Sequence, residues 1–553
     1  MTGKMMETPL RVIDLLRHAN RNHPQVQIVS RRVEGDIHRY TYADAYERVC
    51  QLAHAMTRLG IGEGTRVGTL AWNGYRHLEI YYATAGLGAV CHTLNPRLLS
   101  DQIAWIAQHA RDEVLFFDAT FIGLIETLRA QLPGVRHYVL MGAPDSLVAS
   151  AAARSIPGLL FYESLIAGES AHDIAWPDCD ENAACGLCYT SGTTGEPKGV
   201  CYSHRSTVLH AYASALPDAF ALSARDVVMP VVPMFHVNAW GLPYSLPMVG
   251  GKLVLPGPAL DSKSLYELCE AEHVTLAAGV PTIWLGLLDH LNLYDLRLSS
   301  LERIINGGSA ASTSLIRIFE ERHDVRVVHA WGMTETSPVG TVNQFLPGHE
   351  TLDADERYRL QSRQGREIFG VEMRLESASG AVVPRDGKTP GNLLVKGPWV
   401  VDCYAGGIQA ARKDGWFETG DIATIDPQGF MSIVDRTKDV IKSGGEWISS
   451  IELENAAMAH PAVQEAAVIA RPHPKWVERP LMICVLRTQH TMSADALRAW
   501  LGDKVPKWWL PEGIEFVAAL PHGATGKLLK AKLREQYATY QFDRPNGAQE
   551  VLQ

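Results

Sequence analysis

The chain has 553 residues, of which 46% are hydrophobic, and carries a formal net charge of −10 at pH 7. This length exceeds what one hydrophobic core supports, so we expect two or more domains in a globular protein. The acidic balance argues against general binding to nucleic acid or to anionic membrane surfaces, and any anionic ligand must be held by local cations.

Cysteine usage and hydropathy indicate a cytoplasmic protein. The nine scattered cysteines, an odd number, suit reduced thiols. The longest apolar run, at residues 277–288, is interrupted by Gly279 and Pro281 and is too short to span a membrane. The N-terminal segment carries Arg11 and Asp14 where a signal peptide would need an apolar core. We therefore expect no membrane span and a cytoplasmic location.

Apolar periodicity over the first 140 residues predicts alternating strands and helices, with Thr41 as the N-cap of one helix. The expected elements are a helix, a strand and a helix over residues 10–60, a buried strand at 67–72, a helix at 73–87 and a strand at 89–94. Because strands that alternate with helices form parallel sheets, this segment predicts an α/β organisation. Residues 146–174 are rich in Ala, Ser and Gly and predict no particular element.

A loop rich in glycine and hydroxyl groups follows, with the sequence Tyr-Thr-Ser-Gly-Thr-Thr-Gly-Glu-Pro-Lys-Gly-Val at residues 189–200. Its glycines let backbone N–H groups turn toward one point, and Lys198 adds a positive charge there, which suits a polyphosphate. The spacing differs from that of a Walker loop, and a plain surface turn is the alternative interpretation. Cys185 and Cys188 just upstream are expected to be small apolar residues rather than a metal or redox pair.

Two segments further along contain an aromatic residue near a histidine and a pair of glycines. His236 and Trp240 are four residues apart, so they would share a face of a helix; the alternative is a core aromatic beside a hydrogen-bonded histidine. Residues 305–310, Ile-Asn-Gly-Gly-Ser-Ala, follow an apolar strand, and their glycines permit the close approach of a flat ring. The alternative for residues 305–310 is an ordinary turn between a strand and a helix.

A carboxylate lies beside a hydroxyl in the segment His-Ala-Trp-Gly-Met-Thr-Glu-Thr-Ser at residues 329–337. Mg²⁺ prefers hard oxygen ligands such as the Glu335 carboxylate and shares them with phosphate oxygens. Thr334 and Glu335 equally suit the capped start of a helix. The local residues therefore leave both interpretations open.

The last quarter of the chain predicts a small α+β domain that follows a charged bend. Asp421 ends a turn-like Thr-Gly-Asp, and residues 435–439, Asp-Arg-Thr-Lys-Asp, alternate in charge as solvated bends do. Beyond them we expect helices at 450–459 and from Ser493, strands near 463–470 and 514–517, and a final helix after Lys527.

Taken together and in this order, these motifs resemble those of the adenylate-forming enzymes, the group of acyl-CoA synthetases, carrier-protein adenylation domains and luciferases. The motifs run from the loop at 189–200 to the Gly-Lys at 526–527 and so extend over most of the chain. The resemblance implies an α/β fold with a large N-terminal domain, residues 1–434, of mostly parallel sheets flanked by helices and a β-barrel-like subdomain. It further implies a hinge at 435–439 and a small, mobile α+β lid domain at 440–553.

The resemblance assigns most of the motif residues to ATP and AMP. It places Mg²⁺ at Thr190 and Glu335, the α-phosphate at Thr334, the ribose at Asp421, and makes Lys527 the adenylation lysine. Glu335, Thr334 and Lys527 form the implied catalytic set. The implied nucleotide-binding residues are Thr190, Ser191, Gly192, Thr193, Thr194, Gly195, Lys198, Ser309, Ala310, His329, Ala330, Trp331, Gly332, Met333, Thr334, Asp421, Arg436, Lys438, Lys442, Trp447 and Lys527.

Acyl and coenzyme A sites are implied in the same way. The segment around Trp240 resembles the acyl-channel lining of fatty acyl-CoA synthetases, in which a tryptophan gates the tunnel. The implied acyl pocket consists of His236, Val237, Trp240, Gly307 and Gly308. Coenzyme A is expected at Gly444 and Gly445, with Lys475, Arg479 and Lys530 as candidate cations for its phosphates.

The implied activity is an AMP-forming acid–thiol ligation that uses ATP, Mg²⁺ and coenzyme A. Similarity to medium- and long-chain fatty acyl-CoA synthetases favours an acid of about C6–C12, with depth of the tunnel deciding the length. The alternatives are a 3-(methylthio)propionyl-CoA ligase, another short- or long-chain ligase, a carrier-protein adenylation module, a luciferase-like oxidase and a non-enzymatic scaffold. Relatives of this type are often homodimers, which the sequence itself neither predicts nor excludes.

Overall fold

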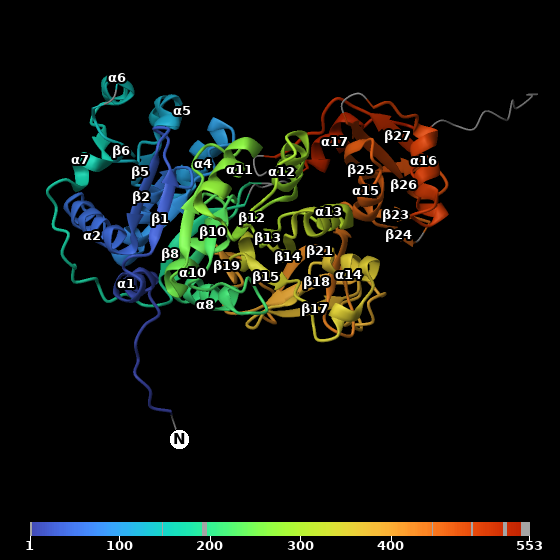
Figure 1. Ribbon diagram of the computed structural model, residues 1–553, viewed down its shortest axis with the longest axis horizontal. Coiled ribbons are helices and arrows are strands. Elements are labelled where there is room, and N and C mark those ends of the chain that lie inside the picture. The colour runs from blue at the N-terminus through green and yellow to red at the C-terminus, as the bar shows by residue number, and fades with distance from the viewer. Residues whose placement is uncertain are drawn as a thin grey trace, which may run out of the picture. The chain divides into compact units, whose positions relative to one another are not determined.

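The computed structural model of the protein describes residues 3–145, 147–190, 196–444, 446–487, 490–523 and 528–542. The chain forms two compact units (Figure 1). The first comprises Met1–Met373 and Leu394–Glu418, and the second comprises Arg374–Leu393 and Thr419–Gln553. The domain boundary expected after residue 434 and the hinge at 435–439 stay predictions.

A nine-stranded sheet in the order β16-β15-β14-β13-β12-β10-β11-β1-β2 forms one layer of the first unit. Its six central strands are parallel, and β2, β15 and β16 are antiparallel to their neighbours. Parallel strands are covered on both faces, which is why β10 and β12 contain no polar side chain. The strands are β1 (Gln27–Arg31), β2 (Ile37–Thr41), β10 (Val227–Pro230), β11 (Lys252–Leu255), β12 (Leu276–Gly279), β13 (Arg303–Asn306), β14 (Arg326–Gly332), β15 (Val339–Val342) and β16 (Arg366–Glu367).

A seven-stranded sheet in the order β7-β6-β5-β3-β4-β8-β9 forms a second layer. All neighbours are parallel except β8 and β9, which form an antiparallel hairpin at the edge of the sheet. The strands are β3 (Arg66–Leu70), β4 (Val90–Thr93), β5 (Val114–Phe117), β6 (His137–Leu140), β7 (Leu160–Phe161), β8 (Ala184–Tyr189) and β9 (Gly199–Ser203). The strands expected at 67–72 and 89–94 are confirmed as β3 and β4.

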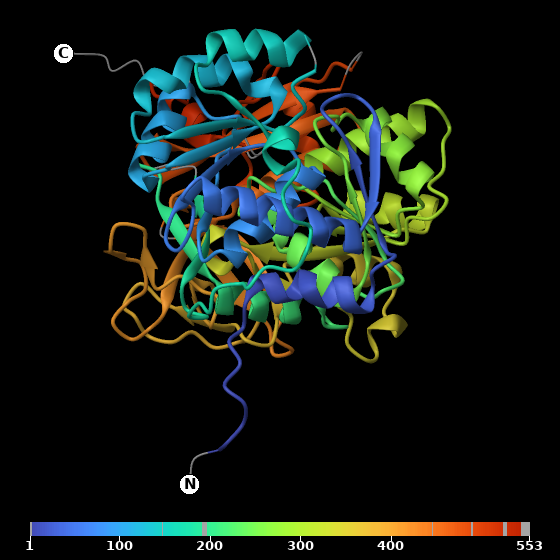
Figure 2. The same ribbon diagram turned by 90° about the vertical axis from the view of Figure 1, so that its left-hand side faces the viewer.

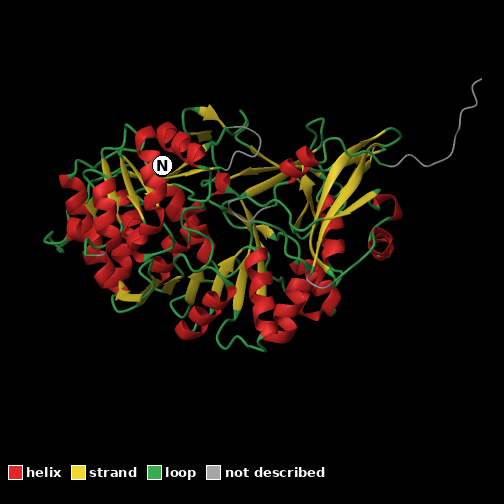
Figure 3. Ribbon diagram, turned by 90° about the horizontal axis from the view of Figure 1, so that it is seen from above, coloured by secondary structure: helices red, strands yellow, loops and turns green. Residues whose placement is uncertain are grey.

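Helices pack against both sheets of this unit (Figure 2 and Figure 3). The Thr41 side chain accepts a hydrogen bond from the Asp44 N–H, and the Asp44 carboxylate accepts one from the Thr41 N–H, so the predicted N-cap is confirmed. None of the helices in the described part of the chain is long and apolar enough to cross a membrane. The helices are α1 (Val12–Asn22), α2 (Tyr42–Arg58), α3 (Tyr75–Gly86), α4 (Ser100–Ala110), α5 (Ile122–Leu128), α6 (Leu147–Ser155), α7 (Tyr162–Ile166), α8 (His204–Ala215), α9 (Val237–Trp240), α10 (Leu242–Val249), α11 (Ser262–Glu272), α12 (Pro281–Leu293), α13 (Thr313–His323) and α14 (Ala354–Gln361).

The second unit is an α+β structure with its own core, as the sequence predicts. Its main sheet runs in the order β24-β23-β26-β25, with β27 parallel to β26. Leu453 and Leu497 of two helices pack against Val468 and Met482 of the sheet. The elements are β22 (Met431–Arg436), β23 (Ile441–Ser443), β24 (Glu446–Ile448), α15 (Ser450–Met458), β25 (Val463–His473), β26 (Val477–Leu486), α16 (Ala494–Gly502), β27 (Gly513–Phe516) and α17 (Lys530–Gln536).

Short strands complete the two units. The division between the units crosses β17 (Glu372–Glu376), β18 (Gly391–Lys396) and β21 (Phe417–Ile425). The hairpin of β19 (Cys403–Tyr404) and β20 (Ile408–Gln409) lies within the first unit. Cys185 and Cys188, in β8, are buried free thiols.

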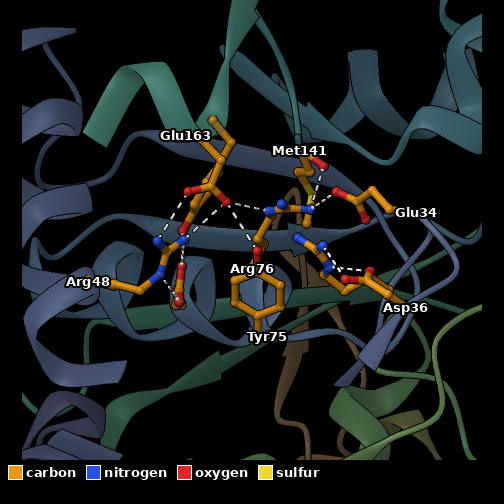
Figure 4. A network of polar contacts seen from close by, with 10 residues as sticks. Glu34, Asp36, Arg48, Tyr75, Arg76, Met141 and Glu163 are labelled. Carbon is orange, nitrogen blue, oxygen red and sulfur yellow. Dashed lines mark hydrogen bonds and ion pairs between the residues drawn. The ribbon is translucent and has the colours of Figure 1, made fainter. Parts of the chain in front are cut away.

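A buried ionic network ties the turn between β1 and β2 to helices α2, α3 and α7 (Figure 4). Arg48 pairs with Glu79 at 2.7 Å and with Glu163 at 3.1 Å. Arg76 pairs with Glu163 at 2.7 Å and with Glu34 at 2.7 Å. The Glu79 side chain is 0% exposed, so water does not stabilise its negative charge. The nearby Arg48 cation provides that stabilisation instead.

We predict that Glu79→Gln lowers the free energy of unfolding by about 3 kcal/mol, because it removes one partner of a buried ion pair. The measurement is urea-induced unfolding of the wild type and the variant. Glu113→Gln is the matched control, since Glu113 pairs with Arg136 at 2.9 Å with side chains 39% and 47% exposed. That control should change the free energy by less than about 1 kcal/mol. Equal losses in the two variants would contradict the argument.

Candidate active site

The glycine-rich loop of residues 189–200 joins β8 to β9, at an edge of the seven-stranded sheet. Its stem is closed by two hydrogen bonds: the Thr190 N–H donates to the Lys198 carbonyl at 2.9 Å, and the Lys198 N–H donates to Thr190 Oγ1 at 3.3 Å. Ser191, Gly192, Thr193, Thr194 and Gly195 lie outside the described residues. The hairpin therefore fixes Thr190 and Lys198 at the two sides of the loop.

Glu335 and Thr334 lie in a single helical turn, Thr334–Thr336, directly after β14, and both are buried. Three donors from other segments hold this dipeptide. Tyr404 Oη donates to Glu335 Oε1 at 3.0 Å, the Val401 N–H donates to the Glu335 carbonyl at 2.8 Å, and Tyr202 Oη donates to the Thr334 carbonyl at 2.9 Å. The position of the carboxylate is therefore set by β9 and β19, which are distant from β14 in the sequence.

The loop stem and Glu335 meet at the ring of Tyr404. Lys198 Nζ lies 5.0 Å from the centroid of that ring, while the hydroxyl of the same residue binds Glu335. A cation over an aromatic face is stabilised by the electrons of the ring. The structure thus brings together the lysine and the carboxylate that the sequence assigned to phosphate and to metal.

The oxygen donors at this point suit a magnesium ion. Glu335 is 8% exposed, and a carboxylate offers about four lone-pair sites, so it can accept from Tyr404 and still bind a cation. Mg²⁺ is held by one or two carboxylates together with substrate phosphates, rather than by a full cage of protein ligands. Among the described residues no group of three or more His, Cys, Asp or Glu side chains could hold a metal ion. The residues present therefore fit Mg²⁺ shared with a polyphosphate.

The segments expected to contact adenine lie on neighbouring parallel strands. Asn306 at the end of β13 is paired with His329 in β14, so Gly307 to Ala310 leave the sheet beside the segment 330–333. His329 donates from Nδ1 to the Ser362 carbonyl at 2.9 Å. The Trp331 indole lies against Gly340, where a Cβ atom would come within 2.5 Å of the ring. This arrangement brings Gly307, Gly308, Ser309 and Ala310 together with His329, Ala330, Trp331, Gly332 and Met333.

Trp240 packs on Gly307. A Cβ atom at Gly307 would lie 2.8 Å from the edge of the indole, so only glycine permits this contact without displacing the ring. Trp240 is 9% exposed. Two residues predicted for the acyl pocket, 67 positions apart in the sequence, are therefore in contact.

The prediction that His236 and Trp240 share one face of a helix is wrong. Residues Val237, Asn238, Ala239 and Trp240 have φ angles between 47° and 58°, so this turn is left-handed. Left-handed geometry costs about 1–2 kcal/mol for each residue with a side chain, and sequence spacing gives no indication of it. His236 precedes the turn with φ −124°.

Buried polar contacts hold the left-handed turn. Asn73 accepts from the Met234 N–H at 2.6 Å and donates to the carbonyls of Pro230 and Val232. Tyr81 Oη donates to the Met234 carbonyl and to Asn238 Oδ1. The strain is thus concentrated at the residues that place the Trp240 indole.

The remaining predicted nucleotide residues belong to the second unit. Arg436 Nε pairs with Asp421 Oδ1 at 2.8 Å, across the β21–β22 register. Lys442 is opposite Trp447 in the β23–β24 pair, and Lys438 follows β22. Gly445 and Lys527 lie outside the described residues.

The candidate cations for coenzyme A differ in their surroundings, and Lys530 Nζ forms an ion pair with Glu454 at 2.7 Å. Lys475 Nζ lies 4.7 Å from the Trp476 ring centroid, near Gly444, whose N–H donates to the Trp476 carbonyl. The Arg479 guanidinium binds Glu512 and Ser443 and the carbonyls of residues 508 and 510. Arg479 could therefore bind a phosphate only if some of these hydrogen bonds were broken.

Sequence reasoning missed Tyr202, Val401 and Tyr404. None of them lies in a motif with recognisable chemistry, and each acts through a contact more than 60 positions away. Burial and the charge of Glu335 raise the pKa of Tyr404, so its hydroxyl keeps the proton that it donates. No local pattern of residues could have indicated these contacts.

Comparison with known proteins identifies similar sequences over nearly the whole chain. The family described as AMP-binding enzyme matches residues 16–405, and the family described as AMP-binding enzyme C-terminal domain matches residues 452–527. The chain is 51% identical to a 3-methylmercaptopropionyl-CoA ligase of Ruegeria lacuscaerulensis, over 97% of this chain and 99% of that protein. It is 48% identical to a medium-chain-fatty-acid–CoA ligase of Ectopseudomonas oleovorans, over 97% and 98%. The fold is similar to that of an anthranilate CoA ligase, AuaEII, with a TM-score of 0.85, 24% identity, and coverage of 97% and 98%.

Buried histidines around the site should make the protein less stable in acid. Burial lowers the pKa of His210, whose Nε2 accepts from the Val339 N–H, to about 3. Below pH 6.5 the unfolded chain binds a proton at this residue while the folded protein does not, so stability falls as the pH falls from about 6.5 toward 3. Between pH 7 and pH 5 this loss is about 2 kcal/mol for one such group.

Lowering the pH from 7 to 5 should reduce the free energy of unfolding of both proteins. We therefore predict that the loss is about 2 kcal/mol larger for the wild type than for His210→Gln. Urea unfolding at the two pH values measures this difference. His172→Gln, at an exposed position, is the control and should keep the wild-type decrease. A decrease in His210→Gln equal to that of the wild type would rule out a neutral, buried His210.

Proposed function

The chain belongs to the AMP-binding enzyme family and is an AMP-forming acyl-CoA ligase, and we propose that its acid is a medium-chain fatty acid of about C6–C12. The observation that supports the ligase activity best is identity near 50%, over nearly the full length, to proteins named as CoA ligases. The contacts of Lys198 with the ring of Tyr404 and of Glu335 with its hydroxyl support ATP as the co-substrate, because they bring a cation for phosphate near a carboxylate suited to Mg²⁺.

The reaction has two steps. The carboxylate oxygen of the acid attacks the α-phosphorus of ATP, and pyrophosphate leaves to give an acyl-adenylate. The coenzyme A thiol then attacks the acyl carbonyl, AMP leaves, and the thiol proton passes to solvent. The first step brings several anions together, so stabilising positive charge matters most there. Bound Mg²⁺ supplies part of that charge.

We assign the residues of the first unit to the first step. Lys198 and the loop bind the β- and γ-phosphates, Thr334 the α-phosphate, and Glu335 with Thr190 the Mg²⁺. Trp331 covers the adenine. The proposed set also contains Ser191, Gly192, Thr193, Thr194, Gly195, Ser309, Ala310, His329, Ala330, Gly332 and Met333.

We assign the second unit to closure and to the second step. Asp421 takes the ribose, Arg436 contacts the ribose or a phosphate, and Lys527 bridges the carboxylate and the phosphate during adenylation. Lys438 is the proposed pivot within a hinge at 435–439, between domains at 1–434 and 440–553. The same surface cannot serve both adenylation and thiol attack, which gives a hinge its physical purpose. Lys442, Trp447, Gly444, Gly445, Lys475 and Arg479 are the remaining proposed contacts to nucleotide and coenzyme A.

The acyl chain is proposed to run past Trp240 and Gly307, with His236, Val237 and Gly308 beside it. Each buried methylene contributes about 0.8 kcal/mol, so a tail of six methylenes gains about 5 kcal/mol over acetate. A 3-(methylthio)propionate specificity is the second candidate, favoured by the identity to a relative named as a ligase of that acid. We also propose a cytoplasmic location and a homodimer as the state to test.

The proposed function is tested by pyrophosphate release with octanoate and ATP, with and without coenzyme A. We expect release that requires octanoate, and octanoyl-CoA once the thiol is added. Lys527→Ala should slow adenylate formation by about 10²–10³, because one preorganised charge is lost. The same variant should convert supplied octanoyl-adenylate and coenzyme A at the wild-type rate. Equal losses in both half-reactions would refute the role of Lys527, and no octanoate-dependent release by the wild type would refute the fatty-acid assignment.

The chain-length proposal is tested with Trp240→Ala. Loss of the indole that lies on Gly307 opens space at the acyl pocket, so the preferred chain should become longer. The measurement is relative kcat/KM over acids from C4 to C16, with 3-(methylthio)propionate included. An unchanged profile would count against Trp240 as the gate, and a wild-type preference for the thioether acid would favour the second candidate.

A further inference from the structure

Tyr404 is the residue on which the loop lysine and the carboxylate of the site converge. It ends the short strand β19 and is 7% exposed. Its hydroxyl donates to Glu335 Oε1 at 3.0 Å, and Lys198 Nζ lies 5.0 Å from the centroid of its ring. One side chain therefore contacts both the anionic and the cationic group of the proposed ATP site.

The strand that carries Tyr404 is fastened to the exit of the glycine-rich loop. The Ala405 N–H donates to the Gly199 carbonyl at 2.8 Å. A Cβ atom at Gly199 would lie 3.0 Å from the Ala405 Cβ and 2.9 Å from the Tyr189 ring, so the two backbones approach as closely as a glycine permits. Movement of residues 404 and 405 would therefore be transmitted to the loop as well as to Glu335.

The hydroxyl and the ring of Tyr404 have separable effects. A donor on Oε1 fixes the rotation of the Glu335 carboxylate before a cation arrives, which lowers the cost of ordering that group on binding. The ring face attracts the exposed Lys198 ammonium, whose Nζ lies 5.0 Å from the ring centroid, while Glu335 is bound at the hydroxyl. A lysine paired directly with Glu335 would compete with Mg²⁺ for the carboxylate and would be less available to ATP.

We propose that Tyr404 is a positioning residue that presents Glu335 to the magnesium ion of MgATP and holds Lys198 apart from it. This inference rests on the proposed ATP-dependent function. It assigns a role to a residue outside every motif of the sequence. The hydroxyl should govern the response to Mg²⁺, whereas binding of the nucleotide phosphates to Lys198 should need only the ring.

The test is the dissociation constant of ATP for the full-length protein, measured by calorimetry without acid or coenzyme A, in EDTA and over a series of Mg²⁺ concentrations. Tyr404→Phe removes the hydroxyl and keeps the ring. We expect its affinity for MgATP to be about tenfold weaker than that of the wild type, which is the effect of one lost hydrogen bond to a charged group. Its affinity for ATP in EDTA should equal that of the wild type.

Two further variants make the result decisive. Tyr358→Phe is the matched control, because Tyr358 also donates to a glutamate, Glu321, at 3.3 Å but lies in the apolar core around α13 and α14. It should leave both affinities unchanged. Lys198→Met should weaken ATP binding with and without Mg²⁺.

The outcomes separate this proposal from the function on which it rests. A Tyr404→Phe protein with wild-type affinity at every Mg²⁺ concentration, or with equal loss in EDTA and in Mg²⁺, would overturn the role of Tyr404 alone. A wild-type protein that binds no ATP under any of these conditions would overturn the proposed function. Thermal unfolding without ligand shows whether each variant is folded, and Tyr404→Phe is expected to match the wild type within a few degrees.

Discussion

A protein with a net charge of −10 can hold a polyphosphate only where local groups oppose the charge of the ligand. In this structure the Lys198 ammonium supplies positive charge directly, whereas the Glu335 carboxylate does so only through a bound cation. Both lie at Tyr404. Lys198 comes from the exit of a hairpin loop, Glu335 from the turn after β14, and Tyr404 stands between them. The two large sheets of the first unit contribute one strand each, β9 and β14. A hydrogen bond from Tyr202 in β9 to Thr334 just after β14 holds the two segments together.

The acyl side of the site obeys a different constraint, which is the close packing of a large ring. The indole of Trp240 needs a glycine beneath it and a left-handed turn beside it. Strained backbone of this kind persists only where the surrounding contacts over-determine it, and Asn73 and Tyr81 supply those contacts. These contacts fix the backbone that carries the Trp240 indole, which is the residue proposed to select the acyl chain.

The fold was predictable from the sequence to a large extent. The alternation of apolar strands and helices gave the parallel sheets, and the Thr41 cap and the elements of the last 100 residues lie close to where periodicity puts them. The chemistry of the loop and of Glu335 was also recognisable, because glycines, hydroxyls and a carboxylate occur there in short, dense motifs. Local patterns of this kind depend on neighbouring residues, which a sequence displays directly.

What sequence reasoning missed depends on contacts between distant segments. The residues 237–240 have helical spacing, yet tertiary contacts hold them in a left-handed turn. Tyr202 and Tyr404 have no motif around them, and their importance arises from hydrogen bonds to residues 132 and 69 positions away. The ion pair of Arg436 with Asp421 likewise follows from strand register rather than from the charged bend in which Arg436 lies.

The most direct test of this account is a crystal structure of the protein with Mg²⁺ and a hydrolysis-resistant octanoyl-adenylate analogue. The account predicts that the phosphate of the analogue lies between Thr190 and Thr334, with Mg²⁺ at Glu335 and the acyl chain against Trp240 and Gly307. An adenylate bound away from Glu335, or an acyl chain that does not touch Trp240, would contradict it.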